Sequence, residues 1–149
     1  MRIELRGEDF EPYAELLAHQ RERLGQAGKY GATCSFVGTM RDFNEGDEVR
    51  TMYLEHYPGM TERQLVRIVE TARSRWEFLD ALVVHRVGEI LPDQAIVLVA
   101  IWSSHRGAAF EACRQVMEEL KHRAPFWKKE TLSGSERWVE RNTPATLVE

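Results

Sequence analysis

Hydrophobic positions recur along the chain with two periods, one typical of strands and one typical of helices. Five segments alternate or are continuously apolar and are predicted to be strands, namely residues 1–6, 31–38, 49–57, 81–87 and 95–103. The segment 31–38 carries no charge, so we expect a buried strand that ends at a glycine. A polar loop is expected over 42–48, and a terminal hairpin is expected around Gly134.

Two helices are expected in the first half of the chain. Asp9 is predicted to cap the first helix, which ends at Gly25. Thr61 and Gln64 have the spacing of a capping box for the second helix, and Met60 is placed to act as its hydrophobic staple.

A third helix precedes the most basic stretch of the chain. Its apolar face is predicted from the helical spacing of Ala109, Cys113, Val116, Met117 and Leu120. Either Ser103 or Ser104 is expected to cap this helix. Pro125 disfavours helical geometry at Ala124, so the helix is predicted to end near Arg123.

Strands and helices are therefore mixed, in the order β, α, β-β, α, β-β, α and a hairpin. This order predicts a single α+β domain over residues 1–149, with a mixed or largely antiparallel sheet of the α/β-hammerhead-like kind. A doubly wound parallel sheet is disfavoured because two strand pairs follow one another without a helix between them. Residues from about 140 onward offer few apolar anchors and are expected to form a loose tail.

Composition narrows the classes of function. The 149 residues carry a net charge of −4, so the chain lacks the overall positive charge expected of a protein that binds nucleic acid along its surface. No apolar run reaches membrane-spanning length, and the N-terminus lacks a signal-peptide core. Cys34 and Cys113 lie in apolar segments and are expected to be buried free thiols. These features predict a cytosolic protein.

The five histidines show no ligand spacing, and no metal site is expected from them. His85 lies in a valine-rich strand, where a hydrogen-bonded structural histidine is the favoured interpretation.

Candidate chemistry is concentrated in three cationic places. Residues 120–129 set lysines on both sides of a proline and two large aromatics, Phe126 and Trp127. This mixture indicates one of two structures. Either the segment forms a rigid pocket entrance that holds the lysines near an anionic ligand, or it is a basic helix end whose aromatics pack in the core. The other two places are Arg41, after a strand, and the pair His105–Arg106, at a strand-to-helix transition where free N–H groups suit a phosphate.

The two kinds of cation suggest a division of labour. Arginine offers a planar fork that suits phosphate oxygens and stays protonated. Lysine can lose its proton and act as a nucleophile or a base. The pattern therefore favours arginines that bind a phosphorylated substrate and lysines that perform the chemistry.

Four segments together resemble the large, catalytic subunit of molybdopterin synthase. They are 54–60 (Leu-Glu-His-Tyr-Pro-Gly-Met), 85–89 (His-Arg-Val-Gly-Glu), 104–112 (Ser-His-Arg, then Ala-Phe-Glu-Ala) and 123–130 (Arg-Ala-Pro-Phe-Trp-Lys-Lys-Glu). The resemblance runs in order from about residue 31 to residue 138.

This resemblance implies a defined reaction. The family converts cyclic pyranopterin monophosphate into molybdopterin, with sulfur from the C-terminal Gly-Gly thiocarboxylate of a small, ubiquitin-like subunit. The large subunit forms a homodimer and binds one small subunit at each end, which gives a heterotetramer. No resident metal or cofactor is implied for this step.

By motif position, Lys121 and Lys128 resemble the catalytic lysines of the family. The resemblance also implies a set of substrate-binding residues: Thr39, Met40, Arg41, His105, Arg106, Lys129 and Glu130. His105 and Arg106 are expected to act across the dimer interface. Phe43 departs from the family pattern, in which a polar residue is expected.

Two other classes of function remain open at this point. One is a non-catalytic docking module for a ubiquitin-like protein, which would tolerate the loss of Lys121. The other is an RNA-binding domain that uses the basic aromatic segment, and the net negative charge of the chain argues against it.

Overall fold

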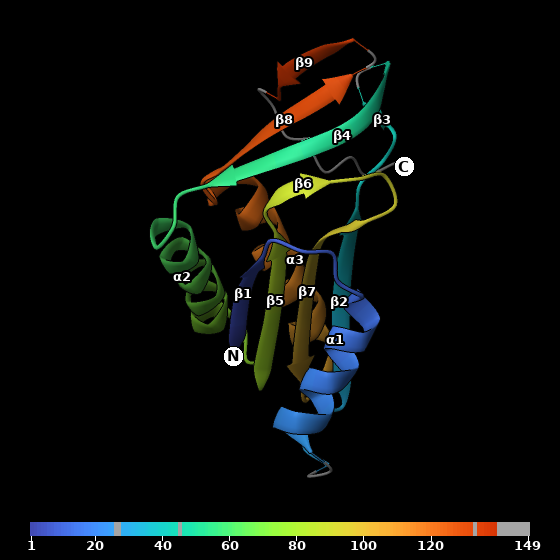
Figure 1. The fold of residues 1–149 in the computed structure, drawn as a ribbon. Coiled ribbons are helices and arrows are strands. Elements are labelled where there is room, and N and C mark those ends of the chain that lie inside the picture. The colour runs from blue at the N-terminus through green and yellow to red at the C-terminus, as the bar shows by residue number, and fades with distance from the viewer. Residues whose placement is uncertain (26–27, 45, 133, 140–149) are drawn as a thin grey trace.

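The computed structural model describes residues 1–25, 28–44, 46–132 and 134–139, in which two β-sheets and three α-helices make up the fold (Figure 1). The α+β class expected from the sequence is confirmed. The single sheet expected there is instead two sheets, which share no hydrogen-bonded strand pair among the described residues. Residues 140–149, where a loose tail is expected, lie outside the described residues.

The first sheet has four strands in the order β1-β5-β7-β2. β1 is parallel to β5, and the other neighbouring strands are antiparallel. The strands span Arg2–Arg6 (β1), Ala32–Thr39 (β2), Asp80–Arg86 (β5) and Ala95–Ser103 (β7). Nearly every residue of β5 and β7 is buried, because these central strands have a neighbour on each side and helices over both faces.

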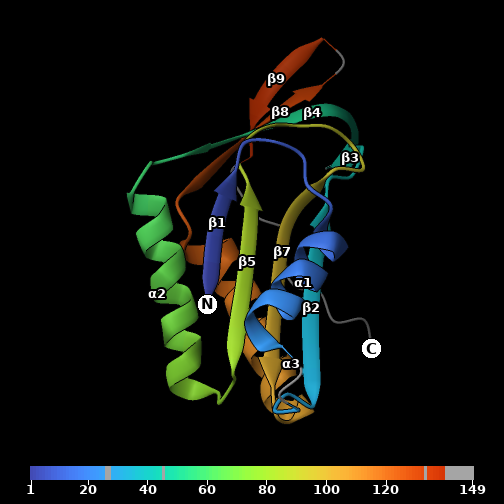
Figure 2. The ribbon, with the colours of Figure 1, turned by 60° about the horizontal axis from the view of Figure 1, so that its bottom comes forward.

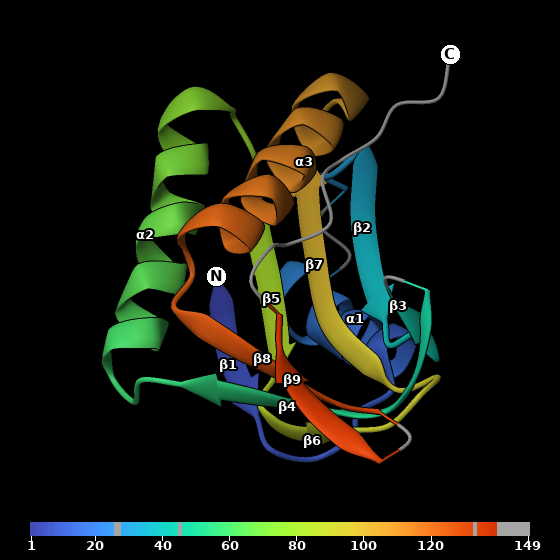
Figure 3. The same ribbon diagram turned by 90° about the horizontal axis from the view of Figure 1, so that it is seen from above.

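The helices cover the two faces of this sheet unequally. α2 (Met60–Arg75) and α3 (Arg106–Arg123) lie on one face, and α1 (Pro12–His19) lies on the other (Figures 2 and 3). A π-helical turn, Gln20–Leu24, extends α1 to Gly25. Side chains alternate across the sheet, so Val83 of β5 packs in the α2–α3 core and Val84 packs in the α1 core.

The second sheet lies across one end of the first (Figure 1). Its strands are β3 (Phe43–Asn44), β4 (Asp47–His56), β8 (Phe126–Leu132) and β9 (Ser135–Trp138), with β6 (Gly88–Ile90) paired to β4. β8 begins three residues after α3 ends, because Pro125 stops the helix where the sequence predicts. The terminal hairpin is confirmed as the β8–β9 pair.

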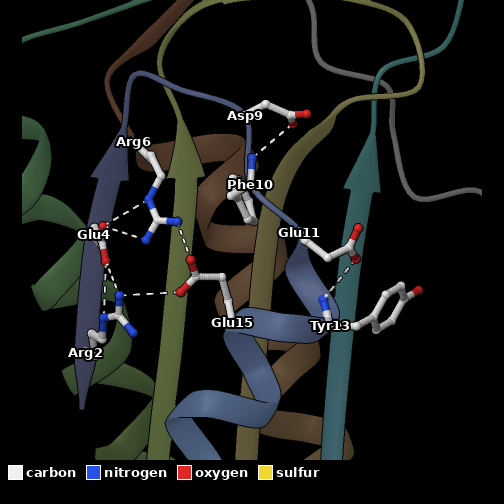
Figure 4. Close-up of polar contacts among 8 residues, drawn as sticks. All are labelled: Arg2, Glu4, Arg6, Asp9, Phe10, Glu11, Tyr13 and Glu15. Atoms are coloured by element: carbon white, nitrogen blue, oxygen red, sulfur yellow. Dashed lines mark hydrogen bonds and ion pairs between the residues drawn. The ribbon is translucent and has the colours of Figure 1, made fainter.

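Ion pairs fasten α1 to β1. Arg2 and Arg6 of β1 both bond the carboxylates of Glu4 and Glu15, the second of which belongs to α1 (Figure 4). Figure 4 also corrects the predicted cap. The Glu11 carboxylate accepts a hydrogen bond from the Tyr13 N–H at 3.4 Å, whereas the predicted Asp9 accepts from the adjacent Phe10 N–H at 3.0 Å, outside the helix.

The predicted cap of α2 is also wrong. The helix begins at Met60, two residues earlier than the capping-box pattern requires, so Glu62 takes the place expected for Gln64 and accepts from the Gly59 N–H at 2.5 Å. Thr61 instead joins two segments, accepting from the Tyr57 N–H and donating to a backbone carbonyl. Met60 is 53% exposed, so it does not act as a buried staple.

Neither predicted serine caps α3. The helix begins at Arg106 with His105 at its N-cap position, and no side chain caps it. The Ser103 hydroxyl donates instead to the Glu77 carbonyl at 3.0 Å, and the Ser104 hydroxyl donates to the Lys29 carbonyl at 3.4 Å. The helix therefore starts too late for either serine to reach its first turn.

Two segments near residue 40 also differ from expectation. β2 is not a buried strand, because it lies at the edge of the first sheet with β7 as its neighbour, and Phe36 is 42% exposed. The polar loop expected over 42–48 is largely a hairpin, in which Phe43 pairs with Glu48. The two cysteines are free thiols as expected, although Cys34 is only partly buried.

Candidate functional site

A small pocket opens where the two sheets and the end of α3 meet. Its volume is about 40 Å³, which is room for a few water molecules. β5, β7, α3 and β8 all contribute to it, and its lining residues are His85, Ile96, Val97, Met117, Leu120, Lys121, Ala124, Phe126 and Lys128. Three of these residues carry titratable nitrogen atoms in an otherwise apolar wall.

The break at Pro125 is what brings the two lysines together. Lys121 lies in the last turn of α3, whose buried side holds Met117 and Leu120 against the sheet. The chain then turns at Ala124, which has extended geometry, and runs back as β8. Lys128 therefore reaches the same pocket from the second sheet.

The electrostatics of the pocket make the Lys128 ammonium easier to deprotonate. Burial, and then the nearby charge of Lys121 and a hydrogen bond to it, lower the pKa of Lys128 from 10.5 to about 8, and Glu130 opposes this shift. Glu130 is buried on β8 and accepts a hydrogen bond from Arg137 Nε at 3.0 Å. A lysine with a lowered pKa can act as a base or nucleophile near neutral pH.

His85 forms part of the pocket wall, which the sequence did not indicate. Its Nδ1 lies 2.7 Å from the Arg86 carbonyl oxygen, which confirms the expected hydrogen-bonded histidine. Its ring stacks on Phe126, with the centroids 4.1 Å apart and an angle of 12° between the planes. Burial lowers the pKa of His85 to about 4, and the charges of Lys128 and Lys121 add to the effect.

Strand alternation separates residues that the sequence places together. Glu130 lies on the same side of β8 as Lys128 and influences its pKa. Lys129 faces the opposite side, where it pairs with Glu136 at 2.8 Å and lies over the Trp138 ring. Trp127 shares that outer side and makes an edge contact with Tyr57, so only Phe126 of the two aromatics walls the pocket.

The residues predicted around Arg41 have different surroundings. Arg41 and Thr39 are exposed at the end of β2, beside the start of β7 that also contributes to the pocket. Met40 is only 4% exposed and packs with Leu54 and Ile90 in a core of its own. Its side chain is therefore structural in this chain, and a contact with substrate is not indicated by its position.

His105 and Arg106 lie far from the lysines of the same chain. They are exposed at the N-terminus of α3, whereas Lys121 lies near its C-terminus. At 1.5 Å per residue, the fifteen residues between Arg106 and Lys121 span about 22 Å. The two ends of α3 cannot contribute side chains to one pocket within a single chain.

No group of three or more His, Cys, Asp or Glu side chains among the described residues is arranged to hold a metal ion. No helix among them is long and apolar enough to cross a membrane.

Comparison with known proteins identifies relatives of this chain. The family described as MoaE protein matches residues 9–123. A molybdopterin synthase catalytic subunit of Ralstonia nicotianae is 50% identical over 138 residues, which is 93% of this chain and 76% of that protein.

Two solved structures share the fold. The MoaE protein of Burkholderia ambifaria superposes with a TM-score of 0.78 at 47% identity, covering 97% of this chain and 92% of that one. A complex of subunits 1 and 2 of molybdopterin-converting factor from Helicobacter pylori matches with a TM-score of 0.76 at 22% identity, covering 93% and 90%. From its sequence and fold, this chain belongs to the MoaE protein family, that of the molybdopterin synthase catalytic subunits.

Proposed function

We propose that this chain converts cyclic pyranopterin monophosphate into molybdopterin, using sulfur from the C-terminal thiocarboxylate of a small ubiquitin-like subunit. The observation that carries the proposal is the meeting of Lys121 and Lys128, from α3 and β8, at one pocket where the pKa of Lys128 is lowered to about 8. Both substrates are anions, which accounts for a local pair of cations on a chain of net charge −4.

The lysine pair suits the step that frees the sulfur. When the thiocarboxylate sulfur bonds to the pterin, the acyl carbon of the tail remains attached to that sulfur as a thioester. Water then attacks the acyl carbon, the carbon–sulfur bond breaks, and the products are a carboxylate, a pterin thiolate and two protons. A neutral lysine amine accepts one of these protons, and the remaining ammonium stabilises the thiolate.

The two lysines divide this work according to their positions. Lys128 has the lowered pKa and is hydrogen-bonded to Lys121, so the pair gives up one proton near pH 8 and the remaining proton can pass between the two amines. When Lys128 holds this proton, Lys121 presents a neutral amine from the packed end of α3. Glu130, buried beside Lys128, favours the charged state that Lys128 reaches after this transfer.

A small subunit is the proposed partner at the pocket. The H. pylori relative was solved as a complex of subunits 1 and 2, which supports the same kind of assembly for this chain. Only the terminal atoms of an extended tail would fit in this pocket, whose walls include Phe126, Leu120 and Ala124.

The substrate phosphate is proposed to lie between two chains. β2 is an edge strand, and Gly31 just before it bonds the Ser103 carbonyl, so the start of β2 lies beside the N-terminus of α3. Antiparallel pairing of β2 with β2 of a second copy would bring the start of one strand next to the end of the other. The partner's His105 and Arg106 would then approach the end that carries Arg41 and the pocket.

The test is a single turnover with purified components. The chain is mixed with thiocarboxylated small subunit and cyclic pyranopterin monophosphate, and product is measured by the fluorescence of its oxidised pterin. We expect dithiolene product from the parent chain and almost none from Lys121→Ala. A chain that binds the small subunit but makes no product would instead be a docking module, and the proposal would be wrong.

A further inference from the structure

We propose that His85 is a positioning residue for the lysine pair, in which its unprotonated Nε2 accepts a hydrogen bond from the Lys128 ammonium. This inference rests on the proposed function for its catalytic consequence, but the hydrogen bond itself can be measured without turnover. Four facts about the pocket lead to it: which residues share the wall, how the ring is held, which nitrogen carries its proton, and what surrounds it.

The first fact is that His85 and Lys128 are neighbours across the pocket. Both line it, from β5 and β8 respectively. Phe126 stacks on the His85 ring at 4.1 Å, and Lys128 lies two residues further along the same strand on the same side. Residues i and i+2 of a strand are about 7 Å apart, so a lysine side chain can reach back to a ring stacked on residue i.

The second fact is that the ring cannot turn freely. One face of the imidazole is covered by Phe126, and Nδ1 is held at 2.7 Å from the Arg86 carbonyl oxygen. A carbonyl oxygen only accepts hydrogen bonds, so Nδ1 must carry the proton. A neutral imidazole has one N–H, and Nε2 is then a bare acceptor.

The third fact is that the ring is neutral at working pH. Burial lowers the pKa of His85 to about 4, with Lys128 contributing more than Lys121 among the charged groups. The larger effect of Lys128 agrees with its amine being the nearer of the two.

The fourth fact concerns the elements packed around His85. β8 contributes Lys128 and Glu130, and α3 contributes Lys121. In register with His85, β1 contributes Leu5 and β7 contributes Val97, which are both apolar.

The remaining neighbour on β5 points away from the pocket. The Arg86 guanidinium bonds the Glu89 carbonyl and the Gln94 side chain, and it pairs with Asp9 at 3.5 Å. Apart from the Arg86 carbonyl, the polar groups described around the His85 ring therefore belong to β8 and α3.

The consequence is a fixed orientation for the Lys128 amine. A hydrogen bond to Nε2 directs the amine toward the pocket and stabilises its protonated form against the burial that lowers its pKa. Removing the acceptor should therefore lower the Lys128 pKa further while it lowers the rate, because the amine loses its orientation. A purely structural histidine would change stability without shifting the titration of Lys128.

Three substitutions separate the contacts of the ring. His85→Asn keeps a donor near the Nδ1 position for the Arg86 carbonyl but has no atom at the Nε2 position. His85→Gln can place an amide oxygen near the Nε2 position and restore the acceptor. Val83→Ala is the matched control, since Val83 is buried on the same side of β5 but does not line the pocket.

The direct measurement is NMR of the full chain with labelled histidine and lysine. We expect His85 to be neutral with Nδ1–H from pH 6 to 9, and the Lys128 titration to move to lower pH in His85→Asn only. Single-turnover rates should fall about tenfold or more in His85→Asn, as for loss of a hydrogen bond to a charged group. His85→Gln and Val83→Ala should stay near the parent rate and midpoint.

The outcomes distinguish the two proposals. An Nε2–H tautomer, or an unchanged Lys128 titration in both His85 variants, would overturn the role of His85 even if the parent chain is active. If the parent chain forms no product, the proposed function is wrong, and the NMR result still decides the hydrogen bond. If His85→Asn does not fold, the labelled parent chain decides: the His85 Nε2 signal should shift as Lys128 titrates, and a constant Nε2 signal would overturn the hydrogen bond.

Discussion

Lys121 and Lys128 carry the same functional group in two different settings, and this difference determines what replacing each should do. Lys121 extends from a helix whose inner side is packed, whereas Lys128 lies on β8, where burial lowers its pKa. Arginine at either position keeps the positive charge but cannot give up its proton. Replacement by arginine therefore separates attraction of anions from proton transfer.

We expect Lys121→Arg to lose nearly all dithiolene formation while it still folds and binds the small subunit, because no neutral amine would then extend from α3. Lys128→Arg should retain more activity, since Lys121 keeps its amine and the arginine keeps a cation beside it. Single-turnover fluorescence with both variants, and calorimetry with the small subunit, test this order. If Lys121→Arg turns over at the parent rate, the proton-transfer role of Lys121 is wrong.

The dependence of the turnover rate on pH follows from the direction in which the pKa of Lys128 is shifted. The folded pKa of Lys128 is lowered to about 8, so the neutral amine is scarce below that pH and accumulates above it. The single-turnover rate should rise with pH, with a midpoint near 8, and reach a plateau by about pH 9.5. A rate that is flat from pH 6.5 to 9.5 would mean that the lysine proton is not transferred in the slow step.

Elements, unlike their ends, are well predicted by the sequence. The strands and helices fall close to their expected ranges because the hydrophobic period reports burial, and α3 ends at Arg123 as Pro125 requires. The caps were wrong for all three helices, since a shift of one or two residues in the helix start changes which side chain can reach the first turn.

The site was only partly predictable for a related reason. Lys121 and Lys128 follow from their motif, but His85 reaches the pocket through contacts between β5 and β8, which are 40 residues apart in the sequence. Lys129 is expected from the resemblance to bind substrate, but strand alternation turns it to the opposite side of β8 from Lys128. The hydrophobic pattern of one segment does not show which side chains of distant segments meet.

The corrected cap of α2 gives a stability test at the scale of one element. Glu62→Ala should destabilise the fold by about 1 kcal/mol, because it removes the acceptor for the Gly59 N–H. Gln64→Ala is the matched control on the same helix, and it should change the free energy of unfolding by less than about 0.5 kcal/mol. Denaturant unfolding measures both variants. Equal losses of unfolding free energy would instead support the Thr61–Gln64 capping box expected from the sequence.

At the scale of the whole molecule, the site is proposed to need two chains, because the phosphate-binding and proton-transferring residues lie at opposite ends of α3. Arg106 and Lys121 are about 22 Å apart along this helix. If each site combines Lys121 of one chain with Arg106 of the other, a chain defective in one residue can be complemented by a chain defective in the other.

The mixing experiment has a defined yield. Arg106→Ala and Lys121→Ala are each expected to be nearly inactive as homodimers. After equal amounts exchange subunits at random, about half of the dimers contain one copy of each variant, and one of their two sites has both residues intact. About a quarter of the parent activity should therefore return, as measured by single turnover before and after exchange. A strictly monomeric chain in light scattering, or no recovery from a mixture whose exchange is verified by mass, would overturn the site shared between two chains.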